Sequence, residues 1–239
     1  MSTLFEGYDA VVLADHPVGY WPLSEKTGQW AFDRSGNGNT GQIIGGVTLG
    51  QPGVVPGTYA MEFDGNNGYI TVGIRTALQL TSALSMEMWI NTNGSIGTAA
   101  YPDIVNCRVY NPGYGGYHFA YDNSSTAILY ELTSSTPQNF DLHTVTLTQG
   151  TWHHVIGTFA NGTMALYLDG TIVGALAGVS LGASGQPFQI GAGGDGYAAF
   201  TGNNTAIYSH ALSPSRIAVH YNAGIRSGIT RNTSGVYVA

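Results

Sequence analysis

The chain has 239 residues and a formal charge of -7, from seven basic and fourteen acidic residues. This balance argues against nucleic acid as a partner, because phosphate binding requires clustered Lys and Arg. Charged residues make up only 9% of the chain, whereas glycine (35) and tyrosine (15) are abundant, a composition typical of a turn-rich β protein.

The N-terminal segment, residues 1–17, predicts a short helix and no targeting signal. It has no basic start, long apolar run or small-residue cleavage site, so we expect no signal peptide and synthesis in a cytoplasm. Asp9 is expected to cap a helix over residues 10–15, which Pro17 ends. No apolar run reaches the roughly 18 residues that a membrane helix needs, so we expect no membrane insertion.

Short runs of alternating residues follow, separated by turn residues at intervals typical of an antiparallel sandwich. Met86, Met88 and Ile90 in the third run share one face, and Glu87 and Trp89 share the other. We predict strands in residues 59–65, 68–73, 84–92, 116–122, 127–133, 143–148 and 187–193.

The strongest strand signal lies in residues 151–176. An Asn-Gly and an Asp-Gly pair separate three runs of β-branched and aromatic residues, and both pairs supply the positive φ that tight turns require. Met164 and Leu166 alternate with Ala165, as in a pleated strand. These features predict a three-stranded meander over residues 153–159, 163–168 and 171–176.

One helix is clearly marked near the C-terminus. Ser213 is expected to be its N-cap, Pro214 its first residue and Gly224 the residue just past its end. Ile217 and Tyr221 are four residues apart and share a face, so we expect this helix to pack on the sheets.

Seven segments, taken together and in order, form a more specific signal than any one of them. They are PVGYWPLSE, DRSGNGNTG, GVTLGQPGVVPG, AMEFDGNNGYITV, LSMEMWI, WHHVIGTFANGTMALYLDG and AIYSHALSPSRIAVHYNAG. The chain thereby resembles the concanavalin A-like lectin/glucanase superfamily, in its laminin-G-like bacterial and phage branch, from about Tyr8 to Gly224. The resemblance implies an all-β fold, a two-sheet antiparallel jelly-roll sandwich with one or two short helices.

Two adjacent histidines, His153 and His154, invite interpretation as a metal or acid-base site, since imidazole is the commonest metal ligand and titrates near neutrality. One pair without a nearby acidic cluster supplies too few ligands for a metal. The Trp-x-His-Val signature of the family falls on Trp152, His154 and Val155. The resemblance therefore implies that His154 is structural and that His153 lies on the opposite face of the strand.

Catalytic signals are absent from the sequence. Glycoside hydrolases of the superfamily carry paired carboxylates on one strand, but Glu87 and Glu131 have no carboxylate two or four positions away. Where the family often has Ile-Asp-Glu, this chain has Asn203 and Asn204, so any role of those acids is absent or altered. The single cysteine, Cys107, excludes an internal disulfide and is expected to be a small buried residue. We predict no enzyme and no catalytic residues.

Calcium is the cofactor that the sequence favours, if one is bound, because it takes oxygen ligands from Asp, Asn and backbone carbonyls. The candidate ligands are Asp33 and Asn37 in one loop and Asp64 and Asn66 in another. The alternative, that these residues form turns by bonding their own backbone, is favoured because neither loop gathers three carboxylates.

Tyrosines offer candidate contacts for sugar rings in residues 110–121. Tyr117, Phe119 and Tyr121 alternate as strand residues do. Tyr110 and Tyr114 remain as candidate ligand-binding residues on a loop.

We predict a non-enzymatic structural protein of a phage virion, capsid-decorating or tail-associated, with a lectin-like fold and a capacity to bind a surface glycan. Domains of this kind usually act outside cells, and a virion protein without an export signal reaches the outside by lysis. Its expected partners are other virion proteins or copies of itself. The alternatives are a bacterial carbohydrate-binding or adhesion module at the cell surface and, third, a glucanase-like hydrolase.

The sequence predicts a division at residue 224. Residues 1–224 form the sandwich, and residues 225–239 form a C-terminal tail whose few apolar residues cannot bury enough surface to offset its ordering entropy. We expect a sheet edge, its own or that of a neighbouring subunit, to hold this tail as an assembly contact.

Overall fold

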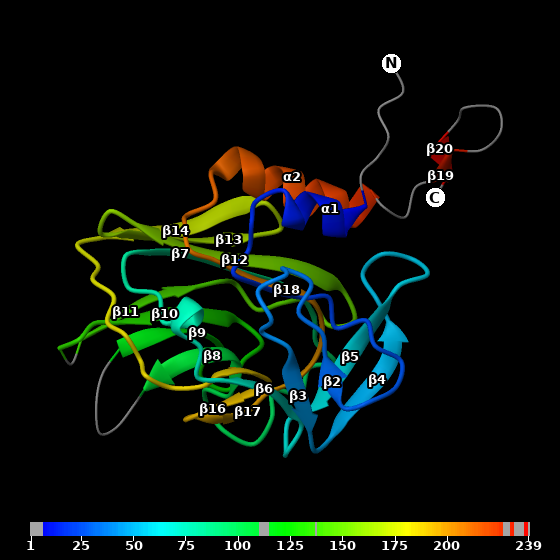
Figure 1. Ribbon diagram of the computed structural model, residues 1–239, viewed down its shortest axis with the longest axis horizontal. Helices are drawn as coiled ribbons and strands as arrows, with labels where there is room; N and C mark the ends of the chain where they lie inside the picture. Colours follow the sequence, from blue (N-terminus) through cyan, green and yellow to red (C-terminus); the bar gives the residue numbers. More distant parts are fainter. Residues whose placement is uncertain (1–6, 110–114, 137, 227–229, 232–236, 239) are drawn as a thin grey trace.

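The computed structural model describes residues 7–109, 115–136, 138–226, 230–231 and 237–238, and two stacked, largely antiparallel sheets form its main part (Figure 1). The expected all-β sandwich is thereby confirmed. Two short strands near the C-terminus, β19 (Thr230–Arg231) and β20 (Tyr237–Val238), pair with each other in a separate two-stranded sheet.

Sheet A has the spatial order β14-β13-β12-β7-β18-β5-β4, with β1 beside β18. Its strands are β1 (Gly19–Trp21), β4 (Val47–Pro52), β5 (Tyr59–Asp64), β7 (Ala83–Asn91), β12 (Trp152–Ala160), β13 (Thr163–Leu168), β14 (Thr171–Ala177) and β18 (Ala199–Tyr208). The predicted meander is β12-β13-β14. Asn161 and Asp169 have φ values of 50° and 52° in its two turns, as the Asn-Gly and Asp-Gly pairs predict.

Sheet B has the spatial order β11-β10-β9-β8-β15-β6-β3-β2, with β16 and β17 beside β8. Its elements are β2 (Trp30–Ala31), β3 (Gly41–Ile44), β6 (Tyr69–Gly73), β8 (Asp103–Val109), β9 (Gly115–Tyr121), β10 (Ile128–Thr133), β11 (Asn139–His143), β15 (Phe188–Ile190), β16 (Ala192–Gly193) and β17 (Gly196–Tyr197). A 3-10 turn, η1 (Thr76–Leu78), lies between β6 and β7.

The strand predicted over residues 143–148 is wrong, because β11 ends at His143. Thr144 donates its backbone N–H to the carbonyl of Ile128, and its side-chain Oγ1 accepts the N–H of Ile128. A side-chain oxygen has replaced a backbone carbonyl in the ladder, so the regular pairing stops there.

The main core lies between the sheets and follows the alternation of the strands. Met86, Met88 and Ile90 of β7 point into it and are almost completely buried. Trp89 and Glu87 point to the opposite face of sheet A, where they are equally buried. That outer face is therefore covered as well.

Two helices, α1 (Tyr8–Leu13) and α2 (Pro214–Arg226), cover the outer face of sheet A (Figure 1). Ser213 caps α2 as predicted, since its Oγ accepts the N–H of Arg216 at 3.3 Å. No helix in the described part of the chain is long and apolar enough to cross a bilayer.

Two helix boundaries differ from the prediction. Gly7, not Asp9, is the N-cap of α1, and Asp9 lies in the first turn, where its Oδ1 accepts a hydrogen bond from the Tyr20 hydroxyl. Gly224 lies inside α2, which continues to Arg226. A Cβ at residue 224 would lie 2.2 Å from Cζ2 of Trp89, so the glycine allows close packing of the helix on the sheet and does not end it.

A buried ionic network joins the two helices to sheet A. His220 of α2 lies between two carboxylates, with Nδ1 2.9 Å from Oε2 of Glu87 and Nε2 2.7 Å from Oδ2 of Asp15. The Tyr8 hydroxyl donates to Glu87 at 3.0 Å, and the Arg216 guanidinium binds both oxygens of Asp15. Glu87 and His220 are fully buried, so their charges depend on each other for solvation.

Candidate functional site

A row of polar side chains crosses four neighbouring strands of sheet B. Asn106 of β8 pairs with His118 of β9, His118 with Glu131 of β10, and Glu131 with Asp141 of β11. Directly paired residues point to the same face of a sheet. Their sequence neighbours, including Cys107 and Tyr117, point into the core. The row therefore lies on the outer face of sheet B.

Arg108 is the cationic centre of this face. It follows Asn106 by two positions on β8, and its guanidinium forms ion pairs with the carboxylates of Glu131 and Asp195. The side chain is 3% exposed. Glu131 also accepts a hydrogen bond from the Thr133 hydroxyl at 3.2 Å. These contacts hold the guanidinium in one orientation, with ion pairs on two sides.

His118 lies beside Arg108 and is 1% exposed. Its Nδ1 is 2.6 Å from Oδ1 of the fully buried Asp103, and its Nε2 is 3.6 Å from Oε1 of Glu131. The other Asp103 oxygen accepts the backbone N–H of Asp195 at 2.9 Å. Asp103 thus orients the imidazole and the turn between β16 and β17 together.

Two acidic side chains that line the open side of the row, Asp141 and Asp195, have raised pKa values. Partial burial of its carboxyl in the groove, followed by the charge of Glu131, raises the pKa of Asp141 to about 6. Burial and the neighbouring Asp103 raise the pKa of Asp195, against the opposing effect of Arg108. Carboxyl groups with raised pKa values in a cleft are typical of functional sites.

These side chains line a groove with a cavity volume of about 240 Å³. At its rim, Tyr101 is 41% exposed, and His143 Nδ1 lies 2.9 Å from Oδ2 of Asp122. The groove therefore combines fixed donors and acceptors with one exposed aromatic ring. Its lining residues are Tyr101, Arg108, His118, Asp122, Leu129, Glu131, Asn139, Asp141, His143 and Asp195.

Three residues of this region could hold a metal ion. Asp103, His118 and Asp195 each offer one ligand atom, and these atoms lie within 4.8 Å of one another. Each of the three also has a partner within the fold, however, and Arg108 already compensates the charge of Asp195. Hydrogen bonds and ion pairs within the fold therefore already account for the positions of these three side chains.

The two loops proposed from the sequence for calcium use their oxygens for turns. Asp33 accepts the N–H groups of Tyr20 and Ser35, and Asp64 Oδ1 accepts three consecutive N–H groups, those of Asn66, Asn67 and Gly68. The Asn37 amide donates to the carbonyls of Pro17 and Val18. This is the turn geometry that the sequence also allowed, and calcium binding there stays a prediction.

His153 and His154 lie on opposite faces of β12. The ring of His154 stacks on Trp89 and on Tyr221, at centroid distances of 4.7 and 6.3 Å, in a cluster in which Trp89 and Tyr221 also stack on each other, and burial lowers the pKa of His154 to about 4. His153 Nδ1 lies 2.8 Å from Oδ2 of Asp169, whose other oxygen accepts the backbone N–H of His154. Both rings therefore pack within the sheet and its turn. Tyr110 and Tyr114 lie outside the described residues.

The sequence did not predict the groove, because its acids do not lie close together on one strand. Glu131 is isolated on β10, and its carboxylate neighbour Asp141 comes from the next strand. One signal was available. His118 and Glu131 each interrupt a strand that is apolar at nearly every other position, on both faces.

The comparisons with known proteins agree with this fold. Residues 64–218 match the family described as the concanavalin A-like lectin/glucanases superfamily. A sequence search of curated proteins finds no match.

Several solved structures share the architecture at low sequence identity. The binding domain of Paraclostridial mosquitocidal protein 1 has a TM-score of 0.73 at 17% identity over 88% of this chain and 53% of that one. The botulinum neurotoxin DC binding domain has a TM-score of 0.70 at 14% identity in complex with SialylT, over 89% and 52% of the two chains. In complex with rat synaptotagmin II its TM-score is 0.71 at 14% identity, over 93% and 55%. The chain spans about half the length of these structures.

Proposed function

The chain belongs to the concanavalin A-like lectin/glucanase superfamily, and we propose that it is a glycan-binding module whose ligand lies in the groove on the outer face of sheet B. The fold class supports binding, and one similar solved domain, that of botulinum neurotoxin DC, is known in complex with SialylT and in complex with rat synaptotagmin II. Because fold alone does not determine function, the groove itself must carry the argument.

The observation that carries the proposal is the row of donors and acceptors around Arg108. Sugar hydroxyls donate and accept at once, and they are recognised by side chains that are fixed before the ligand arrives. Arg108 fixes the carboxylates of Glu131 and Asp195 through its ion pairs, and Asp141 supplies acceptors at the exposed end of the row. Tyr101 offers a ring face at the rim.

The energetics of the row also favour a functional role. Replacing buried ionic groups by apolar side chains of similar size is often neutral or stabilising. Stability alone therefore gives no reason for Arg108, His118 and Glu131 to stand where a sheet could bury Val or Ile. Recognition of a polar ligand gives one.

The test is glycan binding by isosteric variants. Wild-type protein is screened on a glycan array, and the affinity for the best ligand is measured by calorimetry. We expect Asp141→Asn and Tyr101→Ala each to weaken binding about tenfold, as the loss of one charged hydrogen bond or one stacking contact would. Glu62→Gln on β5 is the matched control, since it changes the same group on the other sheet.

Two outcomes would contradict the proposal. One is the absence of any bound glycan on the array, and the other is unchanged affinity in both groove variants. Unfolding is separated from loss of binding by the thermal midpoint, which should stay within a few degrees because Asp141 and Tyr101 are exposed.

Hydrolysis is the second candidate, because Asp141 has the raised pKa of a general acid. Its partner is unsuited to attack on a sugar, since Glu131 is occupied by Arg108 and Thr133. We therefore propose binding without turnover. Release of reducing sugar from β-glucans by the wild type, lost in Glu131→Gln, would establish an enzyme instead.

Location in a phage virion is a separate proposal. Its support is the sequence alone, namely the resemblance to the phage branch of the family and a segment of residues 225–239 with few apolar side chains. Immunogold labelling of purified particles would test it, and particles without label would reject it.

A further inference from the structure

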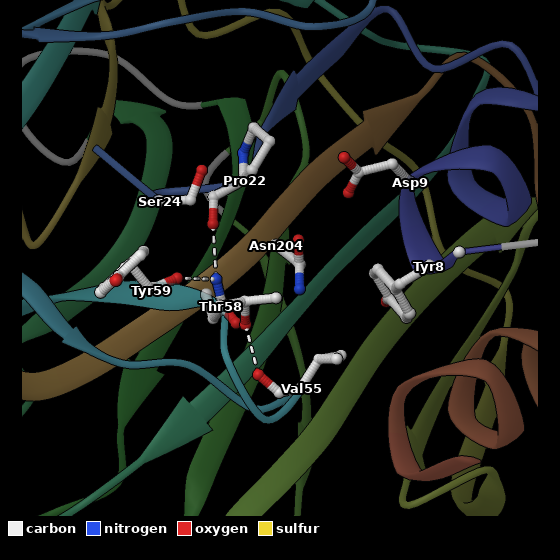
Figure 2. A pocket seen from close by; sticks show the side chains of 10 residues that line it. Tyr8, Asp9, Pro22, Ser24, Val55, Thr58, Tyr59 and Asn204 are labelled. Carbon is white, nitrogen blue, oxygen red and sulfur yellow. Dashed lines mark hydrogen bonds between the residues drawn. The ribbon is translucent and has the colours of Figure 1, made fainter. Parts of the chain in front are cut away.

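A second cavity, of about 360 Å³, opens on the outer side of sheet A and shares no lining residue with the groove. Its walls come from four parts of the chain: α1, the segment after β1, the loop between β4 and β5, and β18 (Figure 2). Asn204 of β18 stands between Asp9 and Tyr8 on one side and Thr58 and Tyr59 on the other.

The chain places Asn204 there by a distortion of β18. The register of β18 against β7 shifts between Asn203 and Ala206, and Asn204 has a φ of 54°. Such bulges redirect a side chain, and asparagine adopts positive φ more readily than most non-glycine residues. The bulge therefore turns Asn204 toward the cavity.

The two neighbouring asparagines differ in how their amides are used. Asn203 donates to the carbonyls of Pro22 and Tyr59 and accepts the N–H of Val54, so its amide is occupied by backbone. Asn204 accepts the Tyr20 hydroxyl at 2.8 Å through Oδ1. Among the described residues its Nδ2 has no hydrogen-bond partner, although Asn204 is 6% exposed. The amide donor of this largely buried residue is thus left open on the cavity side.

Asp9 supplies an acceptor close to this donor. The single proton of the Tyr20 hydroxyl is shared between Asp9 Oδ1 at 2.5 Å and Asn204 Oδ1 at 2.8 Å, so one buried phenol fixes both side chains. Tyr20 is fully buried, and this burial raises the pKa of its hydroxyl, which stays protonated as a donor. The donor of Asn204 and the free oxygen of Asp9 are therefore held as a pair.

The remaining walls define the ligand further. Pro22, Val55 and the rings of Tyr8 and Tyr59 give apolar surface, and Asp9 is the single charged residue among the lining residues. An anionic ligand would be repelled by this carboxylate. A polyhydroxylated ring with one apolar face matches walls that combine aromatic surface, an amide donor and a carboxylate acceptor.

We propose that this cavity is a second carbohydrate site, which takes a neutral sugar residue through two neighbouring hydroxyls. Asn204 Nδ2 donates to one hydroxyl, and Asp9 accepts from the next. The protein then has two separate sugar sites, one on each sheet, and can cross-link glycans as a monomer.

The test follows the side-chain amide signals of Asn204 by ¹⁵N NMR during titration with neutral methyl glycosides of hexoses and N-acetylhexosamines. The signals are assigned by their absence in Asn204→Asp. We expect at least one glycoside to shift them in the wild type and equally in Asp141→Asn, which changes the exposed end of the groove and leaves the buried ion pairs of Arg108 in place. Asp9→Asn and Asn204→Asp should each weaken this binding about tenfold, as loss of one hydrogen bond to a charged or buried group predicts.

Asp9→Asn keeps the test valid if Asn204→Asp fails to fold, because Asp9 is exposed. The proposal is overturned if no glycoside in the panel shifts the Asn204 amide, if Asp9→Asn binds as well as the wild type, or if a methyl glucuronide binds more tightly than its neutral counterpart. If the shift disappears in Asp141→Asn, the two sites are not separate and the second one is rejected while the groove stands.

Discussion

The ionic network under the helices gives a quantitative prediction for Glu87→Gln. Glu87 is fully buried on β7 and bonds to His220 and Tyr8. Removing one member of a buried ion pair costs about 3–5 kcal/mol. Because Asp15 remains 2.7 Å from the other nitrogen of His220, part of the compensation survives, and we expect a loss of about 2–3 kcal/mol. That corresponds to a fall in Tm of roughly 5–10 °C for a chain of this size.

The pH dependence of this loss identifies its cause. Burial lowers the pKa of His220, but Glu87 and Asp15 outweigh it, so the pKa is raised above its usual 6.5. Stability from the His220 charge is therefore fully present below pH 6.5 and lost as pH rises through the raised pKa. Burial raises the pKa of Glu87, but His220 outweighs it, and the pKa lies below its usual 4.5. Stability from Glu87 is present above pH 4.5 and lost as pH falls through the lowered pKa.

Together the two shifts define a window, from about pH 4.5 to 6.5, in which both partners are charged in the folded protein and the pair contributes most. Urea unfolding of the wild type and Glu87→Gln at pH 5.5 and pH 8.5 measures it. We expect the difference in unfolding free energy to be larger at pH 5.5, with equal m-values. Equal differences at both pH values would refute the ionic explanation and leave only the loss of packing and hydrogen bonds.

Three further predictions concern packing, the groove and the tail. Gly224→Ala should destabilise the protein by about 1–3 kcal/mol in thermal unfolding, because the new Cβ would meet the Trp89 ring; an unchanged Tm would show that α2 can move away from the sheet. Glycan affinity in the groove should increase as pH rises through about 6, where Asp141 ionises. Calorimetry of Asp141→Asn should show an affinity that does not change over this pH range. If the wild-type affinity is also independent of pH, Asp141 is not an acceptor for the glycan. Deletion of residues 225–239 should leave the sandwich folded by circular dichroism but abolish assembly measured by light scattering. Normal assembly of the truncated chain would show that the tail is not an assembly contact.

Local patterns in the sequence predicted the elements whose geometry depends on near neighbours. The turns of the meander require positive φ, which Asn161 and Asp169 before glycine adopt readily. Ser213 and Pro214 mark the start of α2 through the free N–H groups of its first turn. The alternation along β7 separated residues of the main core from Glu87 and Trp89. Each of these features needs only a few consecutive residues.

The groove and the second cavity depended on pairings that no local pattern contains. His118, Glu131 and Asp141 become neighbours only through the register of three strands, and a shift of one residue would turn their side chains to the other face. Asn204 faces its cavity because the register of β18 against β7 shifts between Asn203 and Ala206, and because Asn204 Oδ1 accepts the hydroxyl of Tyr20. Gly224 looked like the end of a helix until the ring of Trp89 was placed beside it. The sequence by itself determined the meander with its two turns, the alternation along β7 and the start of α2, because these depend on backbone preferences within a few residues. Only the tertiary structure decided the two candidate sites, because strand register and helix packing bring together residues far apart in the chain.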